Sequence, residues 1–324
     1  MVQFSIVMPV YNLAHLVSDA VGSVFAQSVD DWEIIVVDDG STDDLDAYLK
    51  SVPDRRLRTL SLPHSGLDAA RRAGTDAAGG TYLVYLDADD RLRPSALKRF
   101  SEAFARDPAV GVVYGDRIFM TEDGRSLGKP PRLGLRRPFS GDVFSRVVAG
   151  CPFAAASQAA IRLSVLRDVG GYPLDLGSSG DWYMWCRLAA EVRFAYIGGG
   201  AVTEYRLRAD SLARAWIREP VDTPTIAQFR EVLDAIHDLP EITARFRPMG
   251  QRVLRRRGEA HAYFIKAHEY LRVGRFVPAR QYFGAGIRAW PFDPAALLGF
   301  AMAATKWMPR AAWPYVGYID REAG

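Results

Sequence analysis

The triplet Asp87-Ala88-Asp89 is the acidic segment whose chemistry is simplest to name. Carboxylates repel a diphosphate, but Mg²⁺ or Mn²⁺ held by hard oxygen ligands can bridge the two. Two acids are enough, because Mg²⁺ completes its coordination shell with phosphate oxygens and water. Alone, the triplet is also explained as a solvated turn in which Asp89 or Asp90 caps the next helix. The position of the triplet in the fold therefore decides between a metal site and a turn.

A second acidic segment, Asp38-Asp39-Gly40-Ser41, has the residue types of a nucleoside-binding turn. A carboxylate at a strand end can accept a hydrogen bond from a base N–H, and Tyr11 could lie against the face of the base. An Asx turn followed by a helix explains Asp38 and Ser41 without any ligand. We therefore assign the binding role to Asp39.

The elements that must position these residues are visible in the hydrophobic pattern. Continuous apolar segments indicate buried strands at residues 4–10, 33–37, 57–62 and 82–86. Helices are expected at 15–27, at 66–78 and after the second acidic segment, where Ser41 or Thr42 is a candidate N-cap. This alternation predicts an α/β fold with a mixed, mostly parallel sheet covered on both faces. Ligands bind outside the carboxyl ends of such strands, so both acidic segments should face one crevice.

The second half of the chain becomes helical toward its end. We expect a helix at 181–190, strands at 193–196 and 202–205, and a helical hairpin at 260–290 that turns at Gly274. The apolar segment 295–305 is too short to span a bilayer, and we expect it to pack as a core helix rather than against a membrane surface. The sequence thus predicts an α/β domain at 1–218 and a C-terminal helical region at 219–324.

Composition excludes several classes of protein. A net charge of +3 on 324 residues is too weak a basic balance to indicate a nucleic-acid binder. Two distant cysteines indicate neither a zinc site nor a disulfide framework, and with no leader-like segment they favour the cytoplasm, with contact at the inner face of the membrane left open. A dinucleotide-dependent oxidoreductase would need a Gly-x-Gly-x-x-Gly turn where the chain has Pro9-Val10-Tyr11-Asn12.

Seven segments occur in an order and spacing that resemble family 2 glycosyltransferases of the GT-A fold. The segments are Ser5–Asn12, Val36–Asp43, Gly66–Arg71, Leu86–Asp90, Gly170-Gly171-Tyr172, Asp181-Trp182 and Tyr205-Arg206. None of them is decisive alone. The ordered set predicts an inverting enzyme that takes its sugar from a nucleotide-diphosphate sugar.

The resemblance also implies a role for individual residues. Asp181 matches the catalytic base, which takes the proton of the acceptor hydroxyl, and Asp89 matches the ligand of Mg²⁺ or Mn²⁺. The remaining donor-site residues share contact with the nucleotide sugar: Pro9, Tyr11 and Asp39 at the nucleoside, Asp87 at the ribose, and Arg71 near the base or phosphates. One base suffices for a direct displacement, while a metal stabilises the leaving diphosphate. Trp182, one helical turn before Trp185, is a candidate for stacking on a sugar ring.

Two positions depart from the family's pattern. The residue before the base, often Glu in the family, is Gly180 here, and the place of a His that often contacts the metal or phosphate is taken by Arg208. Arginine cannot ligate a cation but can neutralise a diphosphate through bidentate hydrogen bonds. Arg208 is therefore either a phosphate-binding substitute or an ordinary surface arginine.

These features leave two functions open. The first is transfer of one sugar, from a UDP-sugar by family habit, to a hydroxyl of a surface glycan or lipid-linked saccharide. The second is a catalytically weak nucleotide-sugar-binding protein, motivated by Gly180 and Arg208. A processive membrane synthase of the same family is disfavoured, because such enzymes carry transmembrane helices and a Gln-x-x-Arg-Trp motif that this sequence lacks.

Overall fold

The chain forms two compact units, each described here by itself. The computed structural model describes residues 2–129, 138–151, 153, 155–174, 176, 179–208, 211 and 224–306. The first unit comprises Met1–Ile118, Phe139–Phe144 and Phe153–Arg206, and the second comprises the rest. The domain boundary expected between residues 218 and 219 lies outside the described residues, so that division stays a prediction.

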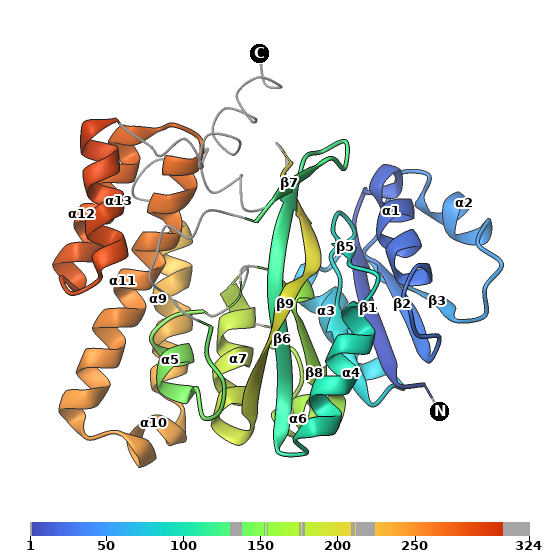
Figure 1. Cartoon of the computed structure of the whole chain (residues 1–324), viewed down its shortest axis with the longest axis horizontal. Helices are drawn as coiled ribbons and strands as arrows, with labels where there is room; N and C mark the ends of the chain where they lie inside the picture. Colours follow the sequence, from blue (N-terminus) through green and yellow to red (C-terminus); the bar gives the residue numbers. More distant parts are fainter. Residues whose placement is uncertain are drawn as a thin grey trace. The chain divides into compact units, whose positions relative to one another are not determined.

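The described strands form one mixed sheet in the order β3-β2-β1-β4-β8-β6-β9-β5, with β7 (Ser126–Gly128) paired to β6 (Figure 1). Parallel pairing is confined to four strands: β1 (Phe4–Val10), β2 (Trp32–Asp38), β3 (Leu57–Ser61) and β4 (Tyr82–Tyr85). The antiparallel part contains β5 (Arg91–Leu92), β6 (Val110–Met120), β8 (Ala159–Arg162) and β9 (Arg193–Arg206). The mixed α/β sheet is confirmed, but it is not mostly parallel, because the described strands after β4 pair antiparallel. The parallel half carries both acidic segments.

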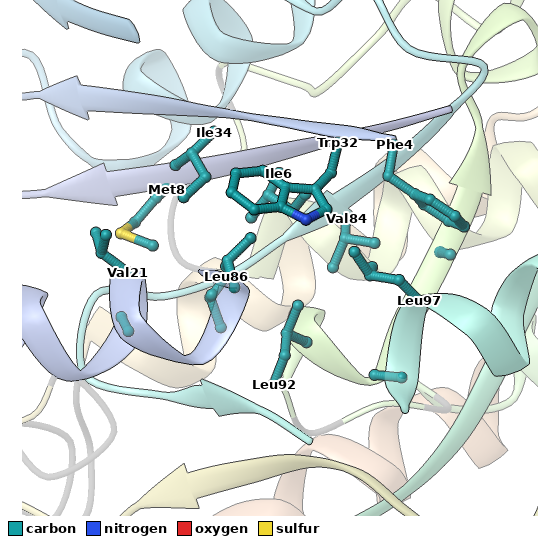
Figure 2. Packing of buried hydrophobic residues seen from close by; sticks show 14 of the residues in the cluster. Phe4, Ile6, Met8, Val21, Trp32, Ile34, Val84, Leu86, Leu92 and Leu97 are labelled. Carbon is teal, nitrogen blue, oxygen red and sulfur yellow. The ribbon is translucent and has the colours of Figure 1, made fainter. Parts of the chain in front are cut away.

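One face of the parallel strands packs against α1 (Ala14–Phe25) and α4 (Ala96–Arg106). Alternate residues of β1, including Ile6 and Met8, lie in this core with Val21 of α1 and Leu97 of α4 (Figure 2). All four side chains are almost completely buried. Burial of such a side chain contributes about 1.5–3 kcal/mol to the free energy of unfolding. This cluster therefore fixes the positions of the strands whose ends carry the acidic segments.

The opposite face of β1 and β2 is covered by α3 (Leu67–Ala77). Gly74 permits this close approach, because a Cβ at that position would lie 2.3 Å from Val7 Cγ1 and 3.1 Å from Val37 Cγ2. The helix therefore lies tightly on the sheet. Its first turns, which carry Asp68 and Arg71, are positioned beside the strand ends.

Two expected local features are wrong. The helix after the second acidic segment is α2 (Leu45–Lys50), and its N-cap is Asp44 rather than Ser41 or Thr42. Ser41 and Thr42 instead hydrogen-bond Asn12. The two strands expected at 193–196 and 202–205 are a single strand, β9. It continues through Gly199 and Gly200, whose positive φ values bend it, and Arg99 donates to the carbonyls of Gly198, Gly200 and Ala201.

The remaining helices of the first part of the chain are short, apart from the one that begins near Gly180. They are α5 (Phe144–Val148), α6 (Leu163–Asp168) and α7 (Gly180–Glu191), with a 3₁₀ turn at Ala156–Gln158. The helix expected at 181–190 is thus confirmed as α7.

The described C-terminal part of the second unit is helical, as expected. It contains α9 (Pro224–His237), α10 (Pro240–Arg245), α11 (Pro248–Arg272), α12 (Phe276–Ala289) and α13 (Pro294–Thr305). Gly274, with φ of +73°, turns the chain between α11 and α12, which confirms the expected hairpin. One face of α13 packs in this unit through Ala296 and Met302, while Leu297 and Leu298 are exposed. Among the described residues, no helix is both long and apolar enough to cross a membrane.

Candidate active site

The carboxyl ends of β1, β2 and β4 meet at one edge of the sheet because these strands are parallel. Backbone hydrogen bonds tie the segments that follow them: Asp39 N donates to Val10 O over 2.9 Å, and Leu62 N donates to Asp38 O over 2.8 Å. Leu86 N donates to Val7 O over 2.9 Å, which carries the Asp87-Ala88-Asp89 triplet to the same edge. The expected convergence of the strand ends is thereby observed.

Asp39 is buried and its carboxylate is occupied by the protein itself. Oδ1 accepts the Ser65 backbone N–H over 2.7 Å, and Oδ2 accepts that of Gly66 over 2.9 Å. The His64 Nδ1 lies 2.9 Å from Oδ2. We call this set, residues 38–41 with 64–66, the Asp39 loop. Asp38 forms the Asx turn that the sequence allowed, since its Oδ1 accepts the Ser41 N–H over 2.8 Å.

Tyr11 is exposed and packs against His64 of the Asp39 loop. The residue is 44% exposed, and its ring stacks on the His64 imidazole, with centroids 4.0 Å apart. Pro9, by contrast, lies inside β1 in register with Val37 and is buried. Tyr11 therefore has the exposure that contact with a base requires, whereas Pro9 supports the site from within the strand.

Arg71 is the cation at the centre of the site. It lies on α3 and is nearly buried, donating to Asp87 Oδ1 over 2.7 Å and to the Tyr172 hydroxyl over 2.9 Å. Its guanidinium carbon also lies 5.4 Å from the Tyr172 ring centroid and 5.8 Å from that of Tyr85. The Arg71 side chain thus joins α3 to the end of β4 and to the segment before α7.

Asp181 faces the same guanidinium from the first turn of α7. Burial raises the pKa of its carboxyl to about 6, and Asp87 adds to this rise, while Arg71 and the Trp182 backbone N–H oppose it. A carboxylate of this kind is a stronger proton acceptor near neutral pH than an exposed aspartate. We call Asp68, Arg71, Asp87, Tyr172 and Asp181 the Asp181 cluster.

Asp68 and Tyr172 belong to this cluster although the sequence reading assigned them no role. Asp68 lies three residues before Arg71, and so on the same face of α3. The Tyr172 hydroxyl hydrogen-bonds Asp68. The sequence signal for Asp68 is its i, i+3 spacing to Arg71, which places both side chains on one face of a helix.

The turn Asp87–Asp90 is held in place by Arg206 of β9. Arg206 donates from Nε to the Asp89 carbonyl over 2.7 Å and from its backbone N–H to Asp90 Oδ1 over 3.0 Å. A third bond runs from its Nη2 to Asp19 on α1 over 2.8 Å. Asp90 is buried and also accepts from Ser157, so it is a structural acid. Asp89 is partly exposed and remains the candidate ligand.

The acidic side chains at this edge of the sheet fit the ligands of a metal ion only in part. In the described portion of the chain, no three His, Cys, Asp or Glu side chains are grouped so that they could hold one. Asp87 is bound to Arg71, and Asp90 to Arg206 and Ser157, while Asp89 is the partly exposed acid that the sequence resemblance names as the ligand. Such a site fits an ion that obtains most of its ligands from a diphosphate and water.

Two further expectations have a structural outcome. Trp182 is 1% exposed, so its ring packs inside the protein and is not placed to stack on a sugar. Arg208 is buried and belongs to the second unit, which rules out the ordinary surface arginine. Its role at a phosphate stays a prediction.

Comparison with known proteins decides the family. The family model described as "Glycosyl transferase family 2" matches residues 5–170. The chain belongs to glycosyl transferase family 2. Its enzyme class is therefore glycosyltransferase, as the ordered motifs predicted. The matched region covers every member of the Asp39 loop and, within the Asp181 cluster, Asp68, Arg71 and Asp87.

Similar proteins include an uncharacterised glycosyltransferase of Nostoc sp., 32% identical over 190 residues, which are 56% of each chain. The succinoglycan biosynthesis protein ExoO of Rhizobium meliloti is 37% identical over 123 residues, 37% of this chain and 35% of that protein. The chain spans 56% of the first curated relative and 30% of the next two, from Rickettsia felis and Rickettsia conorii.

Solved structures establish the GT-A fold. TarS residues 1–349 of S. aureus, in complex with UDP-GlcNAc, superposes with a TM-score of 0.64 at 17% identity, covering 99% of this chain and 91% of that one. The mannosyltransferase PcManGT of Pyrobaculum calidifontis, with GDP-Man and Mn²⁺, gives 0.60 at 20% identity, covering 99% and 86%. The GT-A fold with a helical C-terminal region is confirmed.

Proposed function

We propose that this glycosyltransferase moves one sugar from a nucleotide-diphosphate sugar to an acceptor hydroxyl with inversion, and that Asp181 is the general base. The observation that carries the proposal is the position of Asp181 beside Arg71 and Asp87, with its pKa raised to about 6 by burial. In this step the acceptor proton passes to Asp181. The acceptor oxygen bonds to the anomeric carbon as the bond to the diphosphate breaks.

The donor is proposed to be a UDP-sugar with its base at Tyr11. The exposed Tyr11 ring beside Asp39 offers a stacking face next to a carboxylate, and TarS has been solved with UDP-GlcNAc. Binding at Asp39 would need an additional hydrogen bond to an oxygen that already accepts a backbone N–H. PcManGT binds GDP-Man, so a panel of nucleotides must include GDP.

Arg71 and Asp87 are proposed to bind the rest of the donor, and Arg208 is proposed separately, from the sequence alone, as a phosphate-binding residue. Asp87 projects from a strand end and is held by Arg71, which suits a carboxylate that accepts from ribose hydroxyls. Arg208 would neutralise phosphate oxygens. When Mg²⁺ or Mn²⁺ is bound, Asp89 would hold it, and the ion would offset the charge on the leaving diphosphate. The structure of PcManGT with Mn²⁺ supports testing that ion first.

The acceptor is proposed to be a growing surface glycan or lipid-linked saccharide. The relative from Rhizobium meliloti is named for succinoglycan biosynthesis, which is the kind of product this proposal implies. We propose that the enzyme works in the cytoplasm, with peripheral contact at the inner face of the membrane where such acceptors are assembled.

The test is a thermal-shift panel of UDP-, GDP- and dTDP-sugars with and without Mn²⁺, followed by transfer and hydrolysis assays of the stabilising donor. We expect Asp181→Asn to bind the donor normally and to lose about 10²–10⁴-fold in turnover. Asp46→Asn, an exposed residue paired with Lys50, is the matched control and should match the wild type. A wild-type chain that binds donor but turns none over would identify the weak binder instead.

A further inference from the structure

Asp68 lies in the first turn of α3, partly buried against the proposed base. The Tyr172 hydroxyl hydrogen-bonds it, and Arg71 and Asp181 are the charges that act on it. Tyr172 in turn accepts from Arg71 over 2.9 Å. Asp68 thus shares the charge of Arg71 with Asp181, although the two acids come from helices more than a hundred residues apart.

The carboxylate of Asp68 also reaches the beginning of α7. A Cβ built on Gly180 would lie 3.7 Å from Asp68 Oδ2, a distance that an extended glutamate side chain covers. The backbone of Gly180 is outside the left-handed region, so a side chain there needs only a small movement of Pro173, whose Cγ would lie 3.2 Å from the added Cβ. The same point beside Asp181 can therefore be reached from two backbone positions, 68 and 180, and in this chain only position 68 carries an acid.

The charges in the Asp181 cluster do not balance. Asp68, Asp87 and Asp181 are three carboxyl groups, and Arg71 is the guanidinium that faces them. Burial raises the pKa of Asp68 to about 6, with Asp181 adding to the rise and Arg71 and Tyr172 opposing it. Because the interaction between two titrating groups is reciprocal, the charge on Asp68 also makes Asp181 hold a proton more tightly.

We propose that Asp68 is a positioning residue of this enzyme: from α3 it supplies the second carboxyl group beside Asp181, at the point that a side chain on residue 180 would otherwise reach, and so strengthens Asp181 as the proton acceptor. The inference rests on the proposed role of Asp181. Asp68 supplies a second carboxyl group beside the proposed base although residue 180 is glycine.

Asp68→Asn tests the electrostatic part of this inference. The variant keeps the size of the side chain and removes its charge. We expect the acid limb of the pH profile of kcat/KM to move down by about one pH unit, and turnover at pH 7.5 to fall about tenfold, because a weaker base takes the proton. The donor-induced thermal shift should stay unchanged. An unmoved acid limb contradicts the inference, whatever happens to the rate.

Moving the carboxyl group tests the geometric part. Asp68→Ala with Gly180→Glu places the acid on α7, and Asp68→Ala with Gly180→Ala is its matched control. The added Cβ lies 3.2 Å from Pro173 Cγ in both, so both carry the same steric change. We expect the glutamate variant to recover the wild-type acid limb and most of the rate, and the alanine variant to recover neither. Equal profiles for the two overturn the inference.

A measurement that needs no catalysis separates this inference from the proposed function. The Asp181 carboxyl can be titrated by ¹³C NMR of aspartate-labelled protein, with Asp181→Asn identifying its signal. We expect a pKa of about 6 in the wild type and a lower value in Asp68→Asn. If the two values agree, the inference fails. If they differ while Asp181→Asn retains full turnover, the carboxyl pair stands and the general-base proposal fails.

Discussion

The Asp39 loop and the Asp181 cluster lie at the same edge of the sheet but treat their acids in opposite ways. In the Asp39 loop, each carboxylate oxygen of Asp39 accepts a backbone N–H at 2.7–2.9 Å. In the Asp181 cluster, three carboxyl groups share the guanidinium of Arg71. The pKa of both Asp68 and Asp181 rises to about 6 as a result of burial.

The difference separates an acid whose oxygens are bound by backbone N–H groups from acids whose pKa is raised by burial. Two backbone N–H groups hydrogen-bond the Asp39 carboxylate, which joins two loops through it. In the Asp181 cluster, one guanidinium neutralises only part of the negative charge of three carboxyl groups. This arrangement lowers the stability of the fold and raises the proton affinity of the carboxyl groups. Substitutions that remove one carboxylate charge should therefore have opposite effects on stability in the two regions.

The largest effect is expected at Arg71. Arg71→Met removes the cation and leaves Asp87 and Asp181 without it, which should cost about 3–5 kcal/mol of unfolding free energy at pH 7.5. Urea denaturation measures this cost. Arg106→Met, whose arginine is 76% exposed and pairs with Glu102, is the control and should change stability by less than about 0.5 kcal/mol. Similar costs for the two variants would mean that the Asp181 cluster does not depend on one cation.

Asp181→Asn should stabilise the protein, with a gain that grows from about pH 4 and is complete above about pH 6. A carboxyl whose pKa is raised from 3.8 to about 6 by folding binds its proton more tightly in the folded state. The folded state therefore loses stability as pH rises from about 4 to about 6, and the asparagine variant escapes this loss. We expect a gain of about 2 kcal/mol at pH 7.5 that falls below about 1 kcal/mol near pH 4.

The measurement is urea unfolding of wild type and variant at both pH values. Asp107→Asn serves as the control, because Asp107 is 39% exposed and paired with Arg193 at the surface. A gain that is equal at pH 4 and pH 7.5 would not come from the titration of Asp181.

Asp39→Asn should act in the opposite direction and by a smaller amount. The substituted amide keeps one acceptor oxygen, so either the Ser65 or the Gly66 N–H loses its partner. We expect a loss of about 1–2 kcal/mol at pH 7.5, read from the same urea experiment. Asp44→Asn is the control, since Asp44 is exposed and its side chain makes no capping hydrogen bond. A stabilised Asp39→Asn protein would remove the contrast between the two regions.

The parallel half of the fold was predictable because its signal is local. The apolar segments at 4–10, 33–37, 57–62 and 82–86 correspond to β1–β4 with ends displaced by a residue at most, and parallel pairing follows from the helices between them. The pairing of β6, β8 and β9 was not predictable in the same way. It joins segments far apart in the chain, and β9 passes through three glycines that read as a break.

The site residues also differ in how far local sequence patterns predict them. Arg71, Asp87 and Asp181 stand in recognisable motifs, and the structure brings them together. Asp68 and Tyr172 lie in those motifs too, but their importance depends on contacts between α3 and the segment before α7, which no periodicity encodes. The sequence allowed Trp182 to stack on a sugar ring, but its side chain is buried. Helical spacing alone does not tell which face of α7 is buried.

The smallest effect on stability is expected at Tyr11. Tyr11→Ala removes the ring, stacked on His64 at 4.0 Å, of a residue that is 44% exposed, so unfolding free energy should fall by only about 0.5 kcal/mol. Donor binding should respond more strongly, because the same ring is the proposed contact of the base, and the thermal shift produced by UDP should fall by at least half. Tyr11→Phe keeps the stacking surface and should retain the shift. If Tyr11→Ala keeps the full UDP response, the base binds elsewhere, and the Asp39 loop has a structural role alone.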